Sequence, residues 1–355
     1  MLLLCNQREP LVSMQKTLSH QIKMWLAFLG LAFLLSACAE QEQTTLLVGN
    51  TMGTTYHIKV VPNNRLPDAN LLQAEIDLTL EQVNNQMSTY RPKSELSKFN
   101  SMPREQSVEV SADTVKVLKE SFRLYKLTDG ALDITLGPLV NLWGFGPDKR
   151  PNRIPTDDMI NFAKRQTGIE HVSIQGYKLN KHIPELYVDL SSVAKGFGVD
   201  KVAELLDKYQ VKGYMVEIGG ELRVKGTKPG NKPWRVAVEQ PTVDERRVQQ
   251  VIEPGNMAMA TSGDYRNYYE GDGRRYSHLI DPRTGYPINH RLASATVLHP
   301  SSMTADGLAT AMMVLGTQAS LALAHQENLA VMLIEKQNDG FKVYYSDAFK
   351  PFIKE

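Results

Sequence analysis

The sequence has little cysteine, no excess of charge of either sign and no long apolar run. Its 355 residues include two cysteines, and 40 Lys and Arg residues balance 39 Asp and Glu residues, which leaves a formal net charge of +1. Nucleic-acid-binding proteins normally carry a basic excess, so this balance argues against nucleic acid as a partner. No apolar run reaches the roughly 18 residues that indicate a permanent membrane span.

The N-terminus is typical of an exported lipoprotein. Lys16 and Lys23 precede the apolar run 25–35, which leads into the sequence Leu35-Ser36-Ala37-Cys38. A short apolar core that follows positive charge and ends in small residues is an export signal, removed from the mature protein. The ending Leu-Ser-Ala-Cys resembles the lipobox of bacterial lipoproteins, which implies cleavage before Cys38 and attachment of lipid to that cysteine. The alternative is a buried helix that ends at a cysteine by chance.

We therefore expect a signal peptide over residues 1–37, a lipid-anchored tether over residues 38–46 and a single domain over residues 47–355. Cleavage leaves Cys38 as the only thiol, which excludes an internal disulfide and a cysteine-rich zinc site. The expected location is the bacterial cell envelope, at the periplasmic face of a membrane. Ala39 after the cysteine favours the outer membrane, although the inner membrane stays open.

One stretch, Tyr187–Asp200, has the pattern of a strand followed by a helix. Residues 186–190 are mostly apolar, and Ser191 and Ser192 then offer hydroxyls suited to capping a helix. The helical period that follows places apolar side chains on one face, namely Val199, Val202, Leu205, Leu206 and Tyr209. A hairpin is expected next, over residues 214–226, with Gly219-Gly220 as its turn.

Three residues early in this helix are unfavourable there. Lys195 is a cation where the helix dipole disfavours positive charge, and Gly196 and Gly198 each cost about 1 kcal/mol relative to Ala. One interpretation is that a bulky anion comes close, because backbone N–H groups at a helix start bind phosphate. The other is a solvated lysine beside glycines that let neighbouring elements pack. The residues alone favour neither interpretation.

Two further candidate residues lie elsewhere in the chain. Met52 belongs to the alternating stretch 46–60, which we expect to be a strand, and its soft side chain suits contact with a flat ring. The alternative for Met52 is a place in the core. His278 comes just before the turn Asp281–Gly285 and is a candidate proton carrier. The alternative for His278 is a structural role.

A helix expected from Met303 to about Gly316 carries a candidate cation site. Thr304 is suited to the N-cap position, and Asp306 and Thr310 lie one turn apart on the same face. Carboxylate and hydroxyl oxygens suit Mg²⁺, which keeps few protein ligands and takes the others from phosphate and water. The structural alternatives are that Asp306 interacts with the helix dipole and that Thr310 bonds to a carbonyl one turn earlier.

The motifs are more specific as an ordered set, which reads MGTTYHIKV, MSTYRPKSELSKFN, GALDITLGPLVNLWGFGP, DLSSVAKGFGVDKV, VEIGGELRVKG, SGDYRNYY, YSHLIDPRTGYP and TADGLATAMMVLG. Together they resemble the ApbE family, the FAD:protein FMN transferases, from about Leu46 to Phe352. The resemblance implies an α+β, T-fold-like domain with mixed sheets and packed helices that binds FAD. It also implies a magnesium-dependent reaction in which FMN passes from FAD to a Thr or Ser hydroxyl of a target protein and AMP is released. The implied targets are membrane subunits of sodium-pumping NADH:quinone reductases and of Rnf-type complexes.

The resemblance further implies roles for individual residues. Its FAD contacts would be Met52, Tyr90, Ala131, Leu132, Asp133, Asp189, Lys195 and Ile280. Lys195 would lie near the pyrophosphate, which would explain a cation at the start of a helix. Magnesium would be held by Asp306, Thr310 and Ser192, the last through its backbone carbonyl or its hydroxyl. His278 would act in catalysis beside Lys195 by helping to deprotonate the target hydroxyl.

Three other activities stay open at this point. If water replaced the target hydroxyl, the chain would be an FAD pyrophosphatase that yields FMN and AMP at the same metal site. A periplasmic lipoprotein that only binds or stores FAD would be expected to lack the metal ligands, whereas Asp306 and Thr310 are both present. A flavin redox enzyme would keep FAD intact and release no AMP.

Overall fold

The structure is a computed structural model that describes residues 43–104, 106–146, 154–242, 247–264, 268–271 and 273–354. The predicted signal peptide and Cys38 lie outside these residues. The chain from Thr44 onward forms a unit of its own, and its first strand begins at Thr45, close to the predicted domain boundary. Within the described ranges, no helix combines the length and the apolar character needed to cross a membrane.

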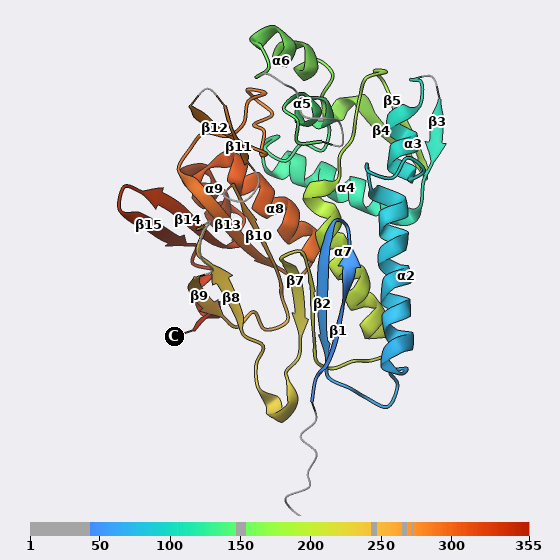
Figure 1. The fold of residues 1–355 in the computed structure, drawn as a ribbon, viewed down its shortest axis with the longest axis vertical. Helices are drawn as coiled ribbons and strands as arrows, with labels where there is room; N and C mark the ends of the chain where they lie inside the picture. The colour runs from blue at the N-terminus through green and yellow to red at the C-terminus, as the bar shows by residue number, and fades with distance from the viewer. Residues whose placement is uncertain are drawn as a thin grey trace, which may run out of the picture. The chain divides into compact units, whose positions relative to one another are not determined.

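An eight-stranded sheet is the centre of this unit (Figure 1). All neighbouring strands in it are antiparallel. In spatial order the strands are β1 (Thr45–Thr51), β2 (Thr54–Val60), β6 (Tyr214–Ile218), β7 (Glu221–Lys225), β10 (Ala258–Gly263), β13 (Leu292–His299), β14 (Ala330–Gln337) and β15 (Gly340–Tyr345). The sheet therefore consists of two four-stranded halves that meet where β7 pairs with β10.

Two tight turns set the register of the first half. The stretch 46–60, expected as one strand, is a hairpin in which Met52-Gly53 forms the turn between β1 and β2. Both turn residues have left-handed backbone angles, with φ of 48° at Met52 and 73° at Gly53, which a two-residue hairpin turn requires. The hairpin with Gly219-Gly220 as its turn is confirmed between β6 and β7.

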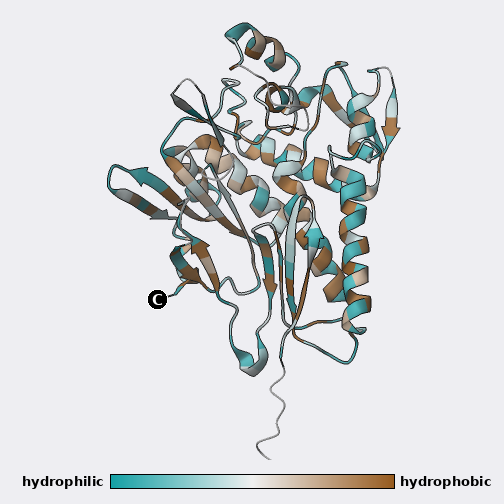
Figure 2. Cartoon of the chain, in the orientation of Figure 1, coloured by the Kyte–Doolittle hydropathy of each residue, from teal (hydrophilic) through white to brown (hydrophobic). Residues whose placement is uncertain are grey.

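Helices cover one face of the sheet. They are α2 (Ala69–Met87), α4 (Ala112–Leu127), α7 (Ser191–Lys208), α8 (Ser302–Leu315) and α9 (Thr317–Gln326). Hydrophobic and hydrophilic residues alternate along α2 in Figure 2, because every third or fourth side chain turns toward the sheet. The apolar face predicted for α7 is confirmed, since Val199, Val202 and Leu206 are buried against strands β2 and β6.

A second, three-stranded sheet covers part of the other face. It consists of β16 (Ile353–Lys354), β9 (Val248–Ile252) and β8 (Val236–Glu239). Along β14 the side chains of Val331 and Leu333 pack on the helices, whereas Met332 and Ile334 pack on the smaller sheet. Strand β14 is thus buried on both faces over residues 330–334, which explains its continuous apolar sequence there.

Most of the remaining elements lie around one end of the helices (Figure 1). The mixture of helices and sheets confirms the predicted α+β fold class. The stretch 94–100 forms a helix because the Ser94 hydroxyl accepts a hydrogen bond from the Ser97 N–H. These elements are α3 (Glu95–Ser101), β3 (Ser107–Glu109), α5 (Gly137–Leu142), α6 (Asp157–Lys164), η1 (Ile169–His171), β4 (Val172–Gln175), β5 (Lys178–Lys181), η2 (Pro229–Asn231), β11 (Tyr268–Gly271), β12 (Arg274–Ser277) and η3 (Lys350–Phe352).

The two glycines early in α7 are explained by packing. A Cβ atom on Gly196 would lie 2.3 Å from the backbone oxygen of Ser302, at the start of α8. A Cβ atom on Gly198 would meet the end of the Met52 side chain at 2.9 Å. Gly196 therefore lets two helices approach backbone to backbone, and Gly198 makes room for a flexible side chain.

This contrast predicts different effects for two equivalent substitutions. Gly196→Ala should lower the free energy of unfolding by about 1–3 kcal/mol, because the added methyl group forces rigid backbone apart. Gly198→Ala should change it by less than about 1 kcal/mol, because Met52 can move and Ala favours the helix. Urea unfolding of both variants and the wild type measures the difference. Equal losses in the two variants would contradict this account.

Candidate active site

The chain approaches α7 without forming the strand expected over residues 186–190. Instead, the Asn100 side chain accepts a hydrogen bond from the Val188 N–H at 2.8 Å and donates one to the Val188 carbonyl at 2.9 Å. The next N–H, of Asp189, donates to the carbonyl of Ile134 at 2.8 Å. A side-chain amide and a loop carbonyl thus replace the strand partner that the pattern predicted.

The cap of α7 also differs from the prediction. The N-cap residue is Leu190 and neither serine hydroxyl caps the helix. The Asp189 carboxylate accepts a hydrogen bond from the Ser191 N–H at 2.8 Å, and a carboxylate at this position suits the positive end of the helix dipole. Ser192, a predicted magnesium ligand, is the second residue of the helix and is half-buried.

Lys195 lies between two buried carboxylates. Its Nζ is 2.8 Å from Oε1 of Glu221 and 3.7 Å from Oδ1 of Asp306. The carboxylate side chains are 4% and 3% exposed, while that of Lys195 is 32% exposed. The lysine is therefore paired rather than freely solvated. Although burial lowers it, the pKa of Lys195 is raised overall because Asp306 and Glu221 stabilise the ammonium.

Glu221 is the residue of this cluster that the sequence analysis missed. Burial raises its pKa to about 7, against the lowering effect of Lys195, and the negative charge of Asp306 adds to the rise. Burial likewise raises the pKa of Asp306. Oε2 of Glu221 is buried and has no hydrogen-bond partner among the described residues. When both carboxylates are ionised, they outnumber the single ammonium and leave a net negative charge in a desolvated place, which favours a further cation.

The cluster is the first step of a charged row between β7 and α7. Alternate residues of β7 point to the helix, and each forms an ion pair with it, at 2.8 Å in every case: Glu221 with Lys195, Arg223 with Asp200 and Lys225 with Asp207. Charges at alternate positions of an otherwise apolar strand were the sequence signal for this row. In the first pair the strand supplies the carboxylate and the helix supplies the cation, whereas in the other two pairs the strand supplies the cation.

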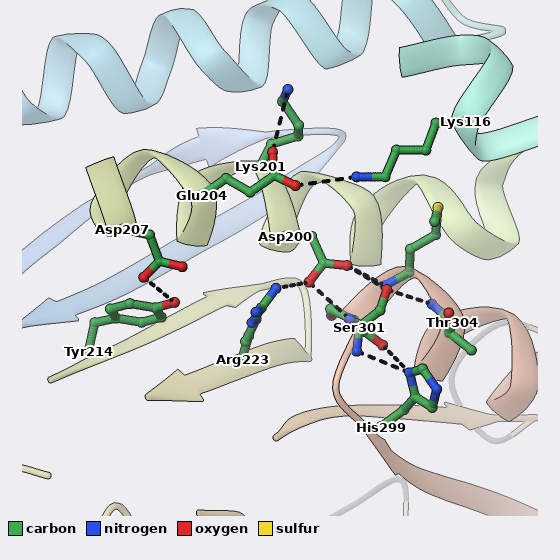
Figure 3. Close-up of polar contacts among 12 residues, drawn as sticks. Lys116, Asp200, Lys201, Glu204, Asp207, Tyr214, Arg223, His299, Ser301 and Thr304 are labelled. Carbon is green, nitrogen blue, oxygen red and sulfur yellow. Dashed lines mark hydrogen bonds and ion pairs between the residues drawn. The ribbon is translucent and has the colours of Figure 1, made fainter. Parts of the chain in front are cut away.

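Asp200 fixes the start of α8 (Figure 3). Its carboxylate accepts hydrogen bonds from the Arg223 guanidinium, the Ser301 hydroxyl and the N–H groups of Ser302 and Met303. Ser301 is the N-cap of α8, and the prediction of Thr304 as its cap was wrong because α8 begins at Ser302. The Asp200 contacts join α7 to α8 one turn and a half beyond Lys195.

Asp306 and Thr310 present oxygen atoms on one face of α8, as predicted. Oδ2 of Asp306 accepts a hydrogen bond from the Gly196 N–H at 3.0 Å, and Oγ1 of Thr310 is 3.3 Å from Oγ of Ser262 on β10. In the described part of the chain, no group of three or more His, Cys, Asp or Glu side chains is arranged to hold a metal ion. The oxygen donors here, beside the unpartnered Glu221 oxygen, have the chemistry that Mg²⁺ prefers.

Two of the segments predicted to contact FAD meet before α7, because the Asp189 N–H donates to the carbonyl of Ile134, the residue that follows Asp133. Tyr90 is 69% exposed, and desolvation together with the charge of Asp189 raises its pKa. Ala131 and Leu132 are buried in the main core. The Asp133 carboxylate accepts hydrogen bonds from the N–H and the hydroxyl of Thr135, and burial raises its pKa.

Ile280 and His278 belong to a different segment, after β12. Ile280 is 3% exposed and pairs through its backbone with Pro287. The His278 ring makes an edge contact with Phe145, with 6.3 Å between ring centroids. Phe145 belongs to a row of aromatic rings in contact, which continues through Tyr269, Tyr276 and Trp143. The structure thus joins Lys195 to Asp306, and it places the His278 ring beside Phe145.

Comparison with known proteins identifies the family. The model of the ApbE family matches residues 52–333. The chain belongs to the ApbE family. A Vibrio cholerae relative named FAD:protein FMN transferase is 54% identical over 334 residues, which cover 94% of this chain and 100% of the relative.

Solved structures of ApbE proteins share the fold. The flavin transferase ApbE from Vibrio cholerae aligns with a TM-score of 0.82 and 55% identity, covering 87% of this chain and 99% of that one. The apo flavinyl transferase ApbE of Pseudomonas stutzeri aligns with a TM-score of 0.82 and 40% identity, covering 88% and 98%. The predicted resemblance to the ApbE family is confirmed, while the roles of the single site residues stay predictions.

His299 predicts a pH dependence of stability near α8. The Ser301 N–H donates to Nδ1 of His299 at 3.0 Å, and burial lowers the pKa of His299 below its ordinary value of 6.5. The folded state therefore disfavours protonation of His299. The contribution of the neutral histidine to stability is fully present above the pKa that His299 has in the unfolded chain, and it is lost as the pH falls below that pKa. His299→Asn keeps an acceptor but removes the titration.

Urea unfolding of both proteins between about pH 8 and about pH 5 tests this expectation. The wild type should lose stability relative to His299→Asn as the pH falls through this range. A difference between the two proteins that stays constant with pH would contradict it.

Proposed function

We propose that this protein is a FAD:protein FMN transferase, which moves FMN from FAD to a Thr or Ser hydroxyl of a target protein and releases AMP. The observation that carries the proposal is the Lys195 ammonium between two buried carboxylates at the start of α7, in a chain of the ApbE family. An ammonium and a helix start together suit the diphosphate of a dinucleotide. The names of the similar proteins support the same activity.

In this proposal FAD lies across the start of α7. Its diphosphate faces Lys195, and its flavin and adenosine parts contact the other predicted residues, which are Met52, Tyr90, Ala131, Leu132, Asp133, Asp189 and Ile280. Two placements support this arrangement. Asp189 lies one residue before Leu190, the N-cap of α7, and the Met52 side chain lies against Gly198, about one turn after Lys195.

The transfer replaces one bond to phosphorus by another. The target hydroxyl oxygen bonds to the phosphorus of the FMN part while the bond from that phosphorus to the bridging oxygen breaks. The bridging oxygen leaves on AMP, and the hydroxyl proton passes to His278 as the proposed base, which would contribute roughly 10²–10⁴-fold to the rate. The Lys195 ammonium stabilises negative charge that builds up on the phosphate oxygens.

Magnesium fits the same place. Asp306, Thr310 and Ser192 would hold it, and their oxygens match its preference. When bound, the ion supplies positive charge that neutralises the diphosphate and the departing phosphate. The negative charge that Glu221 and Asp306 leave around Lys195 supports a cation there.

The setting of the reaction follows from the N-terminal sequence. We infer that lipid on Cys38 anchors the protein at the periplasmic face of a bacterial membrane, with the residues between Cys38 and strand β1 as the tether. The predicted tether of residues 38–46 is thereby shortened, because Thr45 and Leu46 already pair with β2. The targets would then be membrane subunits that expose a Thr or Ser to the periplasm, such as those of sodium-pumping NADH:quinone reductases or Rnf-type complexes.

The metal assignment predicts the effect of one substitution. Asp306→Ala should reduce flavin transfer at least about 100-fold. The substitution removes a proposed ligand of Mg²⁺, and without the ion the charge on the diphosphate is no longer neutralised in the transition state. Purified enzyme is incubated with FAD, Mg²⁺ and a candidate target subunit. Flavin fluorescence that stays with the denatured target and AMP in the supernatant measure the transfer.

Asp207→Asn is the matched control, because Asp207 lies at the far end of the charged row and should keep full transfer. Transfer by Asp306→Ala at the wild-type rate would refute the metal assignment. Release of FMN and AMP without labelled target would instead identify the protein as an FAD pyrophosphatase.

The anchor has a test of its own. Cys38→Ala should move the protein from the membrane fraction to the soluble periplasmic fraction, because a cysteine thiol is required for lipid attachment. A Cys38→Ala protein that stays with the membrane as the wild type does would contradict the lipid anchor.

A further inference from the structure

Lys195 contacts its two carboxylates unequally. The 2.8 Å between its Nζ and Oε1 of Glu221 is a charge-assisted hydrogen bond. The 3.7 Å to Oδ1 of Asp306 is longer than a hydrogen bond. The ammonium is therefore held by Glu221 and only approaches Asp306.

The two carboxylates are fixed, while the lysine can move. Glu221 follows the tight Gly219-Gly220 turn and pairs with Ile218 in the hairpin. The Asp306 side chain is bound to the Gly196 N–H at the contact between the helices. The Lys195 side chain is a flexible four-carbon chain, and its exposed fraction of 32% is far above that of either partner.

Without Glu221, the ammonium would have one nearby carboxylate left. Opposite charges in a desolvated place attract strongly, so Lys195 would close the remaining gap and pair directly with Asp306. That ion pair would be neutral overall, and the Lys195 ammonium would occupy the Oδ1 atom of Asp306. A divalent cation would then have to displace the lysine before it could bind.

We propose that Glu221 is a positioning residue that holds the Lys195 ammonium away from Asp306 and so keeps the Asp306 carboxylate open to a divalent cation. Glu221 need not touch the cation or the dinucleotide in this role. The inference rests on the proposed function, because it takes Asp306 as the cation ligand. It adds that the two carboxylates have different roles: Glu221 holds the lysine, and Asp306 binds the metal.

The test measures binding of Mn²⁺ to the protein without FAD. The electron paramagnetic resonance signal of the free ion is the readout. The test uses the whole protein at about pH 8, above the raised pKa of Glu221. Glu221→Gln should weaken Mn²⁺ binding by about 10–100-fold, the range seen when residues that support metal ligands are replaced. Glu221→Asp keeps the charge but is one methylene shorter, so it should weaken binding as well.

The decisive variant combines two substitutions. Lys195→Met removes the group that would occupy Asp306, so Glu221→Gln with Lys195→Met should bind Mn²⁺ about as well as the wild type. A merely structural role of Glu221 would not be rescued by a second substitution. Asp207→Asn is the control for loss of a carboxylate from the same row and should bind as the wild type does.

Each other outcome overturns the inference. If Glu221→Gln binds Mn²⁺ with the affinity of the wild type, Glu221 is not needed to keep Lys195 away from Asp306. Wild-type affinity in Glu221→Asp, with loss in Glu221→Gln, assigns the effect to charge alone. A double variant as weak as Glu221→Gln makes Glu221 a ligand in its own right.

The proposed function fails separately from this inference. Asp306→Asn should lose Mn²⁺ binding whatever the role of Glu221. If Asp306→Asn binds Mn²⁺ like the wild type, or the wild type does not bind it, the metal assignment itself is refuted. Thermal unfolding curves of all variants show whether each one is folded when its affinity is measured.

Discussion

The backbone contact between α7 and α8 at Gly196 is the constraint on which the site depends. The missing side chain lets the α7 backbone reach Ser302 and lets the Gly196 N–H bind the Asp306 carboxylate. A residue one position earlier, Lys195, is thereby placed beside the same carboxylate. Asp200 ties the two helices a second time. A close approach of two helices thus converts separate sequence motifs into one charged cluster.

Much of the fold follows from local patterns in the sequence. Apolar residues at helical spacing predicted the inward face of α7, where Val199, Val202 and Leu206 are buried. The Gly219-Gly220 pair predicted the β6–β7 turn, because few other residues accept left-handed angles twice in succession. The shared face of Asp306 and Thr310 was predictable as well, since helical geometry alone fixes it.

The rest depends on contacts between distant parts of the chain. Residues 186–190 have a strand-like pattern, but their hydrogen-bond partners are a side chain at Asn100 and a carbonyl at Ile134. The alternating charges of β7 indicate a charged face, but they do not indicate that the partner of Glu221 is Lys195, which is 26 positions earlier in the sequence. Whether Gly196 serves a ligand or a neighbouring helix likewise depends on where α8 lies, and only the structure decides it.

The position of the cluster at the junction between the two halves of the sheet links ligand affinity to folding. Glu221 lies on β7 of the first half and Ser262 on β10 of the second. Lys195 lies on α7, which packs on β6 and β7, whereas Asp306 and Thr310 lie on α8, which packs mainly on β10 and β13. A molecule bound across this junction contacts both halves at once and has no equivalent partner in the unfolded chain. Its binding free energy is therefore added to the free energy of unfolding of the whole sheet. Saturation with the ligand raises the temperature at which both halves unfold together.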